Sequence, residues 1–263
     1  PLSPNNVSLP KSFSTVATIR PLRSLVMLSL AVFALAFSAQ QALAVEIQVE
    51  ILIDSLAQPP APLSNVCTLR KAINNANDNA ATYPQCQAGD VGNDTIVFNL
   101  PGTITFALAG INEDGGETGD LDITDSLTII GHPDGTTIDA ADLDRIFDIH
   151  PGIVVILRNI HITNGTGLGS AGAIQLRGAT LFLENCTISN SYANEGDGGA
   201  IVMADSAILN MTNSTISGNA AEHHAGAMVV EGGSTANITR RAPQTIAATP
   251  STFRSSSSAT KMT

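Results

Sequence analysis

Three six-residue stretches of this chain are near-copies of one another: AGAIQL at residues 171–176, GGAIVM at 198–203 and AGAMVV at 225–230. They recur every 27 residues, and in each one an apolar residue is followed two places later by another. Side chains at i and i+2 lie on the same face of a β-strand. Recurrence at this interval indicates that the chain returns to the same strand position once per turn of a repeating structure.

The same pattern extends toward the N-terminus, where the spacing becomes 26 residues. The first ladder has five rungs, which are Leu121/Ile123, Phe147/Ile149, Ile174/Leu176, Ile201/Met203 and Met228/Val230. A second ladder contains Leu127/Ile129, Ile153/Val155/Leu157, Leu181/Leu183 and Leu209/Met211, and a third contains Ile138, Ile162, Ile188 and Ile216. Three short strands per turn in constant order predict an all-β fold, a parallel β-helix with a dry apolar interior.

Two kinds of corner separate these strands. Asn159, Asn185 and Asn213 each stand just before the third strand, where Asn tolerates a left-handed backbone and can bond its own main chain. Stacked above one another, their side chains are expected to pair as an amide ladder. The glycines of the 171–176, 198–203 and 225–230 stretches are expected to supply a positive φ before the first strand.

Two motifs resemble known β-helix families. The stretches TISN at residues 187–190 and TISGN at 215–219, together with the Gly-Ala-Ile elements, resemble the repeats of polymorphic outer-membrane proteins. Upstream, CTLRKAI at residues 67–73 resembles the CSLREAI motif that opens many bacterial β-helix proteins, with Thr68 and Lys71 as departures. Together the resemblances cover residues 66–239 and imply a right-handed, pectate-lyase-like parallel β-helix at the cell surface, without implying one catalytic chemistry.

The cysteines point to a stapled cap. Cys67 and Cys86 bracket a helix-like segment over residues 69–77, and an oxidising compartment permits them to pair. We therefore predict a Cys67–Cys86 disulfide that holds a short helical cap on the first turn, because an open solenoid end would expose apolar surface. Cys186 occupies an inward position equivalent to Ile160 and Ser214, which predicts a buried, unreactive thiol.

The N-terminal residues have the pattern of a secretory signal peptide. Residues 1–44 contain no acid, Arg20 and Arg23 precede an apolar run over 25–37, and residues 42–44 read Ala-Leu-Ala. A membrane anchor is the alternative, but the run is shorter than the roughly 20 residues a spanning helix needs. We expect a protein secreted or displayed on the cell surface or outer membrane, with no transmembrane segment after signal cleavage.

Charge restricts the partners. All 23 acidic residues lie between residues 45 and 239, where the only basic residues are Arg70, Lys71, Arg145, Arg158 and Arg177. Nucleic-acid binding requires clustered Lys and Arg, so this composition argues against it. The remaining candidates are an extracellular polysaccharide and a host or cell-surface protein.

Acidic side chains on the first ladder suggest a cation site. Asp122 and Asp148 lie between inward pairs on successive turns, so they are expected to be neighbours on an exposed sheet, with Asp120 beside them. Like charges in such positions repel, and a hard cation relieves the repulsion. Asp120, Asp122 and Asp148 are therefore candidate Ca²⁺ ligands. A solvated acidic face is the alternative, and the Gln and Val residues on the later rungs favour it.

Two further polar segments have weaker patterns. The loop at residues 112–120, NEDGGETGD, has the composition of a cation loop but lacks EF-hand spacing, which favours a simple excursion between turns. His223 and His224 lie in an insertion without a third ligand nearby, so they are expected to face solvent. Residues 240–263 contain no ladder and no acid, and are expected to be a disordered or frame-shifted tail.

These observations divide the chain into four parts: a leader at 1–44, a cap at 45–94, the β-helix at 95–239 and the tail at 240–263. The predicted function is that of a structural or adhesin-like surface protein. The alternative is a lyase or hydrolase acting on uronate-type polysaccharides, because pectate-lyase-like enzymes hold Ca²⁺ with carboxylates and use an Arg as base. Arg145, Arg158 and Arg177 are the candidates for that base. The spacing selects none of them, so we assign no catalytic or cofactor-binding residue.

Overall fold

The computed structural model describes residues 44–56, 65–111, 113–239, 253–255 and 261–262. The predicted signal peptide, apart from its last residue, and most of the predicted tail lie outside the described residues. No helix in the described part of the chain combines the length and apolar character needed to cross a membrane.

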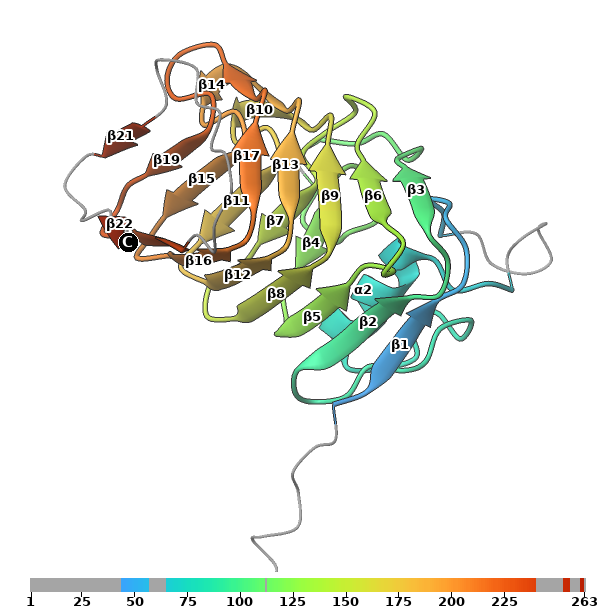
Figure 1. The fold of residues 1–263 in the computed structure, drawn as a ribbon. Helices are drawn as coiled ribbons and strands as arrows, with labels where there is room; N and C mark the ends of the chain where they lie inside the picture. Colours follow the sequence, from blue (N-terminus) through green and yellow to red (C-terminus); the bar gives the residue numbers. More distant parts are fainter. Residues whose placement is uncertain (1–43, 57–64, 112, 240–252, 256–260, 263) are drawn as a thin grey trace, which may run out of the picture. The chain divides into compact units, whose positions relative to one another are not determined.

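The described residues form a parallel β-helix with a helical cap at one end of the stack (Figure 1). The first-ladder sheet contains β4 (Leu121–Ile123), β7 (Phe147–Ile149), β11 (Ile174–Arg177), β15 (Ile201–Ala204), β19 (Met228–Val230) and β21 (Phe253–Ser255). The second-ladder sheet contains β1 (Glu46–Val49), β2 (Asp94–Phe98), β5 (Leu127–Ile130), β8 (Val154–Arg158), β12 (Thr180–Glu184), β16 (Ile208–Thr212), β20 (Thr235–Thr239) and β22 (Lys261–Met262). The third-ladder sheet contains β3 (Gly102–Thr105), β6 (Thr136–Asp139), β9 (Ile160–Thr163), β13 (Thr187–Ser189) and β17 (Thr215–Ser217).

The strand register confirms the three predicted ladders. Phe147 pairs with Leu121 on one side and Ile174 on the other, and the first-ladder series continues in register through Ile201 to Met228. These five side chains are at most 1% exposed. The third ladder is equally regular, with Ile138, Ile162, Ile188 and Ile216 in adjacent positions. One continuous core cluster therefore fills the interior, as the recurrence predicts.

A fourth, short sheet was not predicted. It contains β10 (Thr166–Ser170), β14 (Tyr192–Asp197) and β18 (Ala220–Ala221), which pair in parallel. Each of the three strands follows the third-ladder strand of its own turn. Strands β10 and β14 are rich in glycine and polar residues, β18 consists of two alanines, and none of the three shows an alternation of large apolar side chains. Sequence periodicity therefore gave no signal for them, because backbone pairing rather than an apolar face holds them together.

The corners are confirmed in part. Asn159, Asn185 and Asn213 have φ angles of 57°, 55° and 50°, and the Asn185 Nδ2 donates to Asn159 Oδ1 at 3.3 Å, one step of the predicted amide ladder. The expected positive φ is present at Gly198, where φ is 72°, but not at Gly172, because the left-handed residue there is Ala171 with φ 48°. A Cβ on Gly172 would lie 2.2 Å from the Gly199 carbonyl oxygen. Glycine is needed here because successive turns approach closely.

The cap contains α2, Leu69–Asp78, which contacts β1, β2 and β4. Thr68 caps its N-terminus by accepting a hydrogen bond from the Lys71 backbone N–H. The predicted Cys67–Cys86 disulfide is present, with a Cα–Cα distance of 4.7 Å. Strand β1, within the segment expected to be the cap, pairs with β2, so the second-ladder sheet begins upstream of the helix.

Arg70 joins the cap to the β-helix. Its guanidinium is fully buried, and Nε and Nη2 donate to the two carboxylate oxygens of Asp54 at 2.7 and 3.2 Å. The remaining N–H groups donate to the carbonyl oxygens of Gly119 and Asp120 at 2.8 Å and of Gly116 at 3.4 Å. One side chain of the cap helix therefore holds the loop that precedes β4.

Cys186 is buried as predicted, at 2% exposed, and its thiol lies 3.3 Å from the Leu157 carbonyl oxygen. Burial raises the pKa of this thiol to about 11. We expect iodoacetamide at about pH 8 to leave Cys186 unmodified in the folded protein and to alkylate it after denaturation in urea, because only the thiolate reacts. Alkylation at equal rates in both states, measured by mass spectrometry, would contradict this burial.

Candidate functional site

Asp122 and Asp148 are neighbours, as predicted, because β4 and β7 pair with these two residues in register. The predicted exposure of this acidic face was wrong, since the two residues are only 1% and 2% exposed. The chain over residues 113–120 covers them, and the Gly116 backbone N–H donates to Asp122 Oδ2 at 2.9 Å. The loop, which the sequence indicated as a simple excursion between turns, therefore covers the outward faces of β4 and β7.

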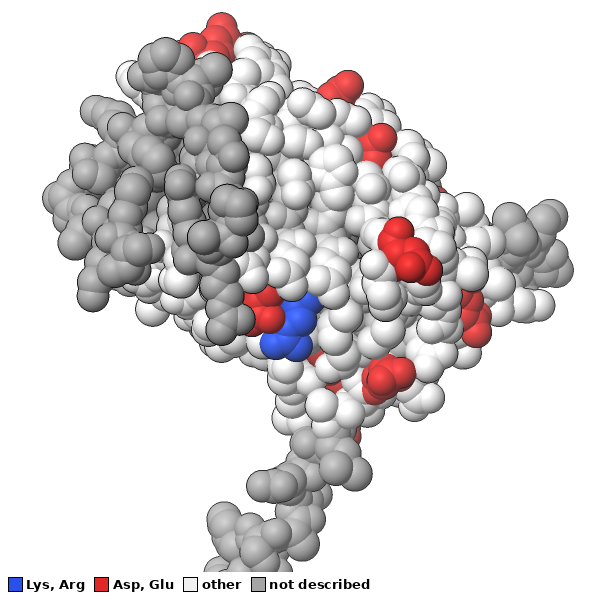
Figure 2. Space-filling view, viewed as in Figure 1, with Lys and Arg blue, Asp and Glu red and all other residues white. Residues whose placement is uncertain are grey.

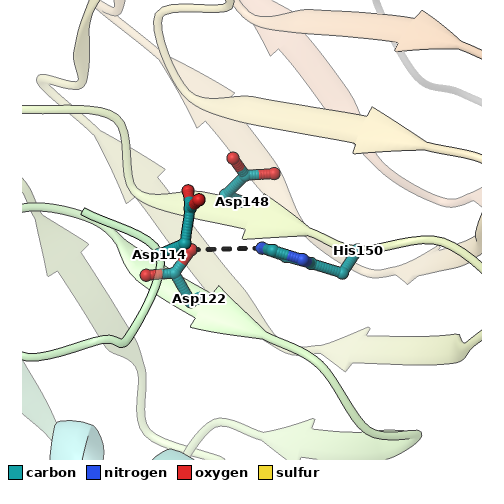
Figure 3. Close-up of side chains that lie close together, drawn as sticks. All are labelled: Asp114, Asp122, Asp148 and His150. Atoms are coloured by element: carbon teal, nitrogen blue, oxygen red, sulfur yellow. Dashed lines mark hydrogen bonds and ion pairs between the residues drawn. The ribbon is translucent and has the colours of Figure 1, made fainter. Parts of the chain in front are cut away.

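Two side chains complete a cluster around these carboxylates (Figure 3). Asp114 enters from the covering loop, and His150 follows Asp148 on the outward face at the end of β7. The His150 Nε2 lies 3.4 Å from Asp122 Oδ1. One ligand atom from each of the four residues lies within 4.8 Å of the other three. We refer to Asp114, Asp122, Asp148 and His150 as the acidic cluster.

Asp120 lies beside this cluster and is bonded differently. It pairs with Arg145, whose Nη2 lies 2.9 Å from Asp120 Oδ2. The same guanidinium donates to Gln175 Oε1 at 2.9 Å. Of the three arginines considered as bases, Arg158 is elsewhere, paired with Glu184 on the second-ladder sheet.

Arg145 and Arg177 both contact the acidic cluster at Asp148. Their Nη2 atoms lie 3.4 and 2.8 Å from one oxygen of Asp148, Oδ2. The other oxygen, Oδ1, is buried and accepts no hydrogen bond from the residues that the structure describes. An uncompensated carboxylate oxygen in a buried position requires an explanation, because such groups are almost always satisfied.

Burial governs the electrostatics of this region. It raises the pKa of Asp120 to about 7, although the charge of Arg145 acts in the opposite direction. It raises the pKa of Asp122 to about 6, against the opposing hydrogen bonds from Gly116 and His150. Burial also raises the pKa of Asp144. Neighbouring carboxylates also raise the pKa of Asp120, Asp122 and Asp144, as a smaller effect than burial.

A different surface is open to solvent on the third-ladder sheet. Its outward side chains form a row across five successive strands, which in register are Thr103, Thr137, His161, Thr187 and Thr215. None of them is fully buried. We refer to this row as the hydroxyl row. Figure 2 shows that the face carrying β6, β9 and β13 has few charged side chains.

A groove of about 480 Å³ crosses the hydroxyl row between adjacent turns. It is lined by polar side chains that include Thr137, His161 and Thr187, with the corner residues Asn159 and Asn185 at its edge. The His161 Nε2 lies 2.8 Å from Ser189 Oγ, and burial lowers the pKa of this imidazole. The groove therefore presents uncharged hydrogen-bonding groups at the spacing of the turns.

The two adjacent histidines of the later insertion lie outside both the acidic cluster and the hydroxyl row. His223 and His224 are exposed as predicted, and His224 Nδ1 lies 2.8 Å from Asp197 Oδ1. The sequence interpretation missed His150 and the hydroxyl row, although the strand alternation that identified Asp122 and Asp148 also marks both as outward-facing. Asn112, at the start of the covering loop, lies outside the described residues.

Comparison of the chain with protein-family models, with curated proteins and with solved structures found no match.

Proposed function

We propose that this protein is a non-catalytic β-helix, secreted or displayed at the cell surface, that contacts a neutral extracellular polysaccharide through the hydroxyl row. The observation that carries the proposal is the in-register repetition of Thr and His side chains on one open face. Hydroxyl, amide and imidazole groups both donate and accept hydrogen bonds, as sugar hydroxyls do. Strands on adjacent turns lie about 4.8 Å apart, so the row offers a repeating polymer a repeating set of contacts.

Charge favours a neutral polymer over an acidic one. The sequence carries 12 basic and 23 acidic residues, and the basic ones are concentrated in the leader and tail. The β-helix itself is therefore strongly negative and repels polyanions such as uronate polymers. The groove beside the hydroxyl row adds no charged carboxylate or ammonium group to its lining.

Three observations support an exported location. Residues 1–44 have the composition of a secretory leader, and the motif at 67–73 resembles those of bacterial surface β-helix proteins. The Cys67–Cys86 disulfide is of the kind that persists in oxidising compartments.

The uronate lyase alternative loses its main support from the position of Asp122 and Asp148. Both carboxylates are buried under the covering loop, whereas a polysaccharide cleft requires carboxylates that substrate can reach. Arg145 and Arg177 are engaged with Asp120 and Asp148 rather than free to act as a base.

The double variant Thr137→Ala/Thr187→Ala tests the proposal. We expect the protein to be depleted from solution by at least one insoluble neutral polysaccharide, such as a glucan or chitin, and this variant to bind at least tenfold more weakly. The matched control is Thr180→Ala/Thr212→Ala, which removes two half-buried threonines from the outward face of the second-ladder sheet. Equal loss in both variants, or no binding to any neutral polymer, would refute the proposal. Release of unsaturated products from pectin, abolished by Asp148→Ala, would instead establish the lyase alternative.

A further inference from the structure

We propose that the acidic cluster is a binding site for one divalent cation, with Zn²⁺ or Mn²⁺ preferred over Ca²⁺. The ligands are three carboxylates and one imidazole, from Asp114, Asp122, Asp148 and His150. This site is independent of the proposed polysaccharide contact, because it lies on the first-ladder sheet and the hydroxyl row lies on the third-ladder sheet.

The geometry approaches that of a metal centre. Ligands on one zinc ion lie about 2.0–2.2 Å from the metal, so two ligand atoms are at most about 4.4 Å apart, and about 3.3–3.6 Å apart in a tetrahedron. The His150 Nε2 and Asp122 Oδ1 are already 3.4 Å apart. The whole set lies within 4.8 Å, so the most widely spaced ligand atoms must move about 1 Å closer to surround one zinc ion.

A second observation is independent of the clustering. Asp148 is 2% exposed, both arginines approach its Oδ2, and its Oδ1 has no hydrogen-bond partner within the described part of the chain. Figure 3 shows its carboxylate on the same side of β7 as Asp114 and the imidazole of His150. A cation supplies the partner that Oδ1 lacks, on the side of the carboxylate that the guanidinium groups leave free.

The local charge favours a cation in the same place. Six carboxylates lie in or next to the cluster, from Glu113, Asp114, Asp120, Asp122, Asp144 and Asp148, and among the described residues the arginines paired with them are Arg145 and Arg177. Buried charges are costly unless they are paired. A bound divalent ion offsets about half of the excess negative charge.

The ligand types select the metal. Distances alone would admit Ca²⁺, whose bonds are about 2.3–2.6 Å long. However, Ca²⁺ takes oxygen ligands, and His150 offers nitrogen. Carboxylates suit Mn²⁺ and imidazole suits Zn²⁺, so a mixed set points to these two ions. Asp120, Asp122 and Asp148 alone suggested Ca²⁺. With His150 as a ligand, the expected ion becomes Zn²⁺ or Mn²⁺.

The ion has a route to the site. Asp114 is exposed, His150 is partly exposed, and a cavity of about 240 Å³ between α2 and the covering loop is lined by Asp114 and Asn74. The covering loop is also bonded to the cap, since Asn74 Nδ2 donates to the Gly116 carbonyl at 3.4 Å. A bound cation therefore ties the cap, the loop and the first two rungs of the first-ladder sheet together.

The test is metal binding by the full chain after removal of bound ions with a chelator. Calorimetric titration with ZnCl₂, MnCl₂ and CaCl₂ is expected to show one site per chain, tightest for Zn²⁺ or Mn²⁺. Asp114→Asn and His150→Gln, two substitutions at residues that are not fully buried, are each expected to weaken binding at least tenfold without changing the far-ultraviolet circular dichroism. The matched controls are Asp134→Asn and His223→Gln, exposed residues of the same types outside the cluster.

The outcomes are distinct. Binding that survives both cluster substitutions, or that disappears in His223→Gln, would overturn the proposal, because the ion would then be elsewhere. Absence of binding for all three ions at millimolar concentration would also overturn it. Binding of Ca²⁺ alone that is insensitive to His150→Gln would refute the assignment of the imidazole as a ligand.

Discussion

Replacing Arg70 with methionine is expected to lower the free energy of unfolding by about 3–5 kcal/mol, the usual cost of removing one partner of a buried ion pair. The substitution leaves the buried Asp54 carboxylate without its cation. It also removes the donors to the carbonyl oxygens of Gly119 and Asp120. Urea unfolding followed by circular dichroism measures the change.

Two further variants separate charge from geometry. Arg70→Lys keeps the charge but cannot make the paired bonds to Asp54, so we expect an intermediate loss. The control Arg158→Met breaks an ion pair whose side chains are 39% and 37% exposed, and is expected to cost less than about 1 kcal/mol. A loss in Arg70→Met no larger than in Arg158→Met would show that Arg70 does not hold the cap.

Phe147→Ala is expected to destabilise the protein by about 3–5 kcal/mol, because a fully buried aromatic side chain is lost and a cavity remains. Phe147 lies between Leu121 and Ile174, so the cavity interrupts the first ladder at its second rung. The control is Phe182→Ala, which removes the same side chain from the partly exposed outward face of β12. The same urea titration is expected to show a much smaller change for Phe182→Ala. Equal changes would mean that Phe147 is not part of a stacked core.

The ladders could be predicted from the sequence because two simple rules act together. Alternation within a strand selects the inward side chains, and the constant interval between turns places equivalent residues above one another. The register of Leu121, Phe147 and Ile174 follows from these rules alone. The Cys67–Cys86 pairing was accessible for a related reason, since the two residues flank the short segment that forms α2.

The site could be predicted only where it depends on the same rules. The adjacency of Asp122 and Asp148 follows from the interval between turns, but their burial does not. Their cover comes from residues 113–120, a loop without periodicity, whose path is determined by bonds to Arg70 and Asn74 in the cap. Strand alternation continued by one step would have marked His150, because it is two residues beyond Asp148.

The wrong expectation of a positive φ at Gly172 and Gly226 has a similar origin. Glycine before a strand suggests a positive φ, yet Ala171 and Ala225 adopt the left-handed conformation themselves. Gly172, which follows Ala171, is required by a contact between turns, because a Cβ there would meet the Gly199 carbonyl. Contacts of this kind join residues 27 positions apart, and local turn preferences do not report them.

The central claim is that successive turns stack in this register, since both the acidic cluster and the hydroxyl row depend on it. The most direct measurement is disulfide formation between cysteines introduced on adjacent turns at exposed or half-exposed positions. Thr180→Cys/Ile208→Cys places two cysteines directly opposite each other on β12 and β16, within the distance a disulfide spans. Thr180→Cys/Asn210→Cys shifts one of them two residues along the same face, beyond that distance. We predict that mild oxidation links the first pair within one chain, as detected by mass spectrometry of proteolytic peptides, and leaves the second pair unlinked. Failure of the first pair to link, or equal linkage of both pairs, would contradict the stacked register.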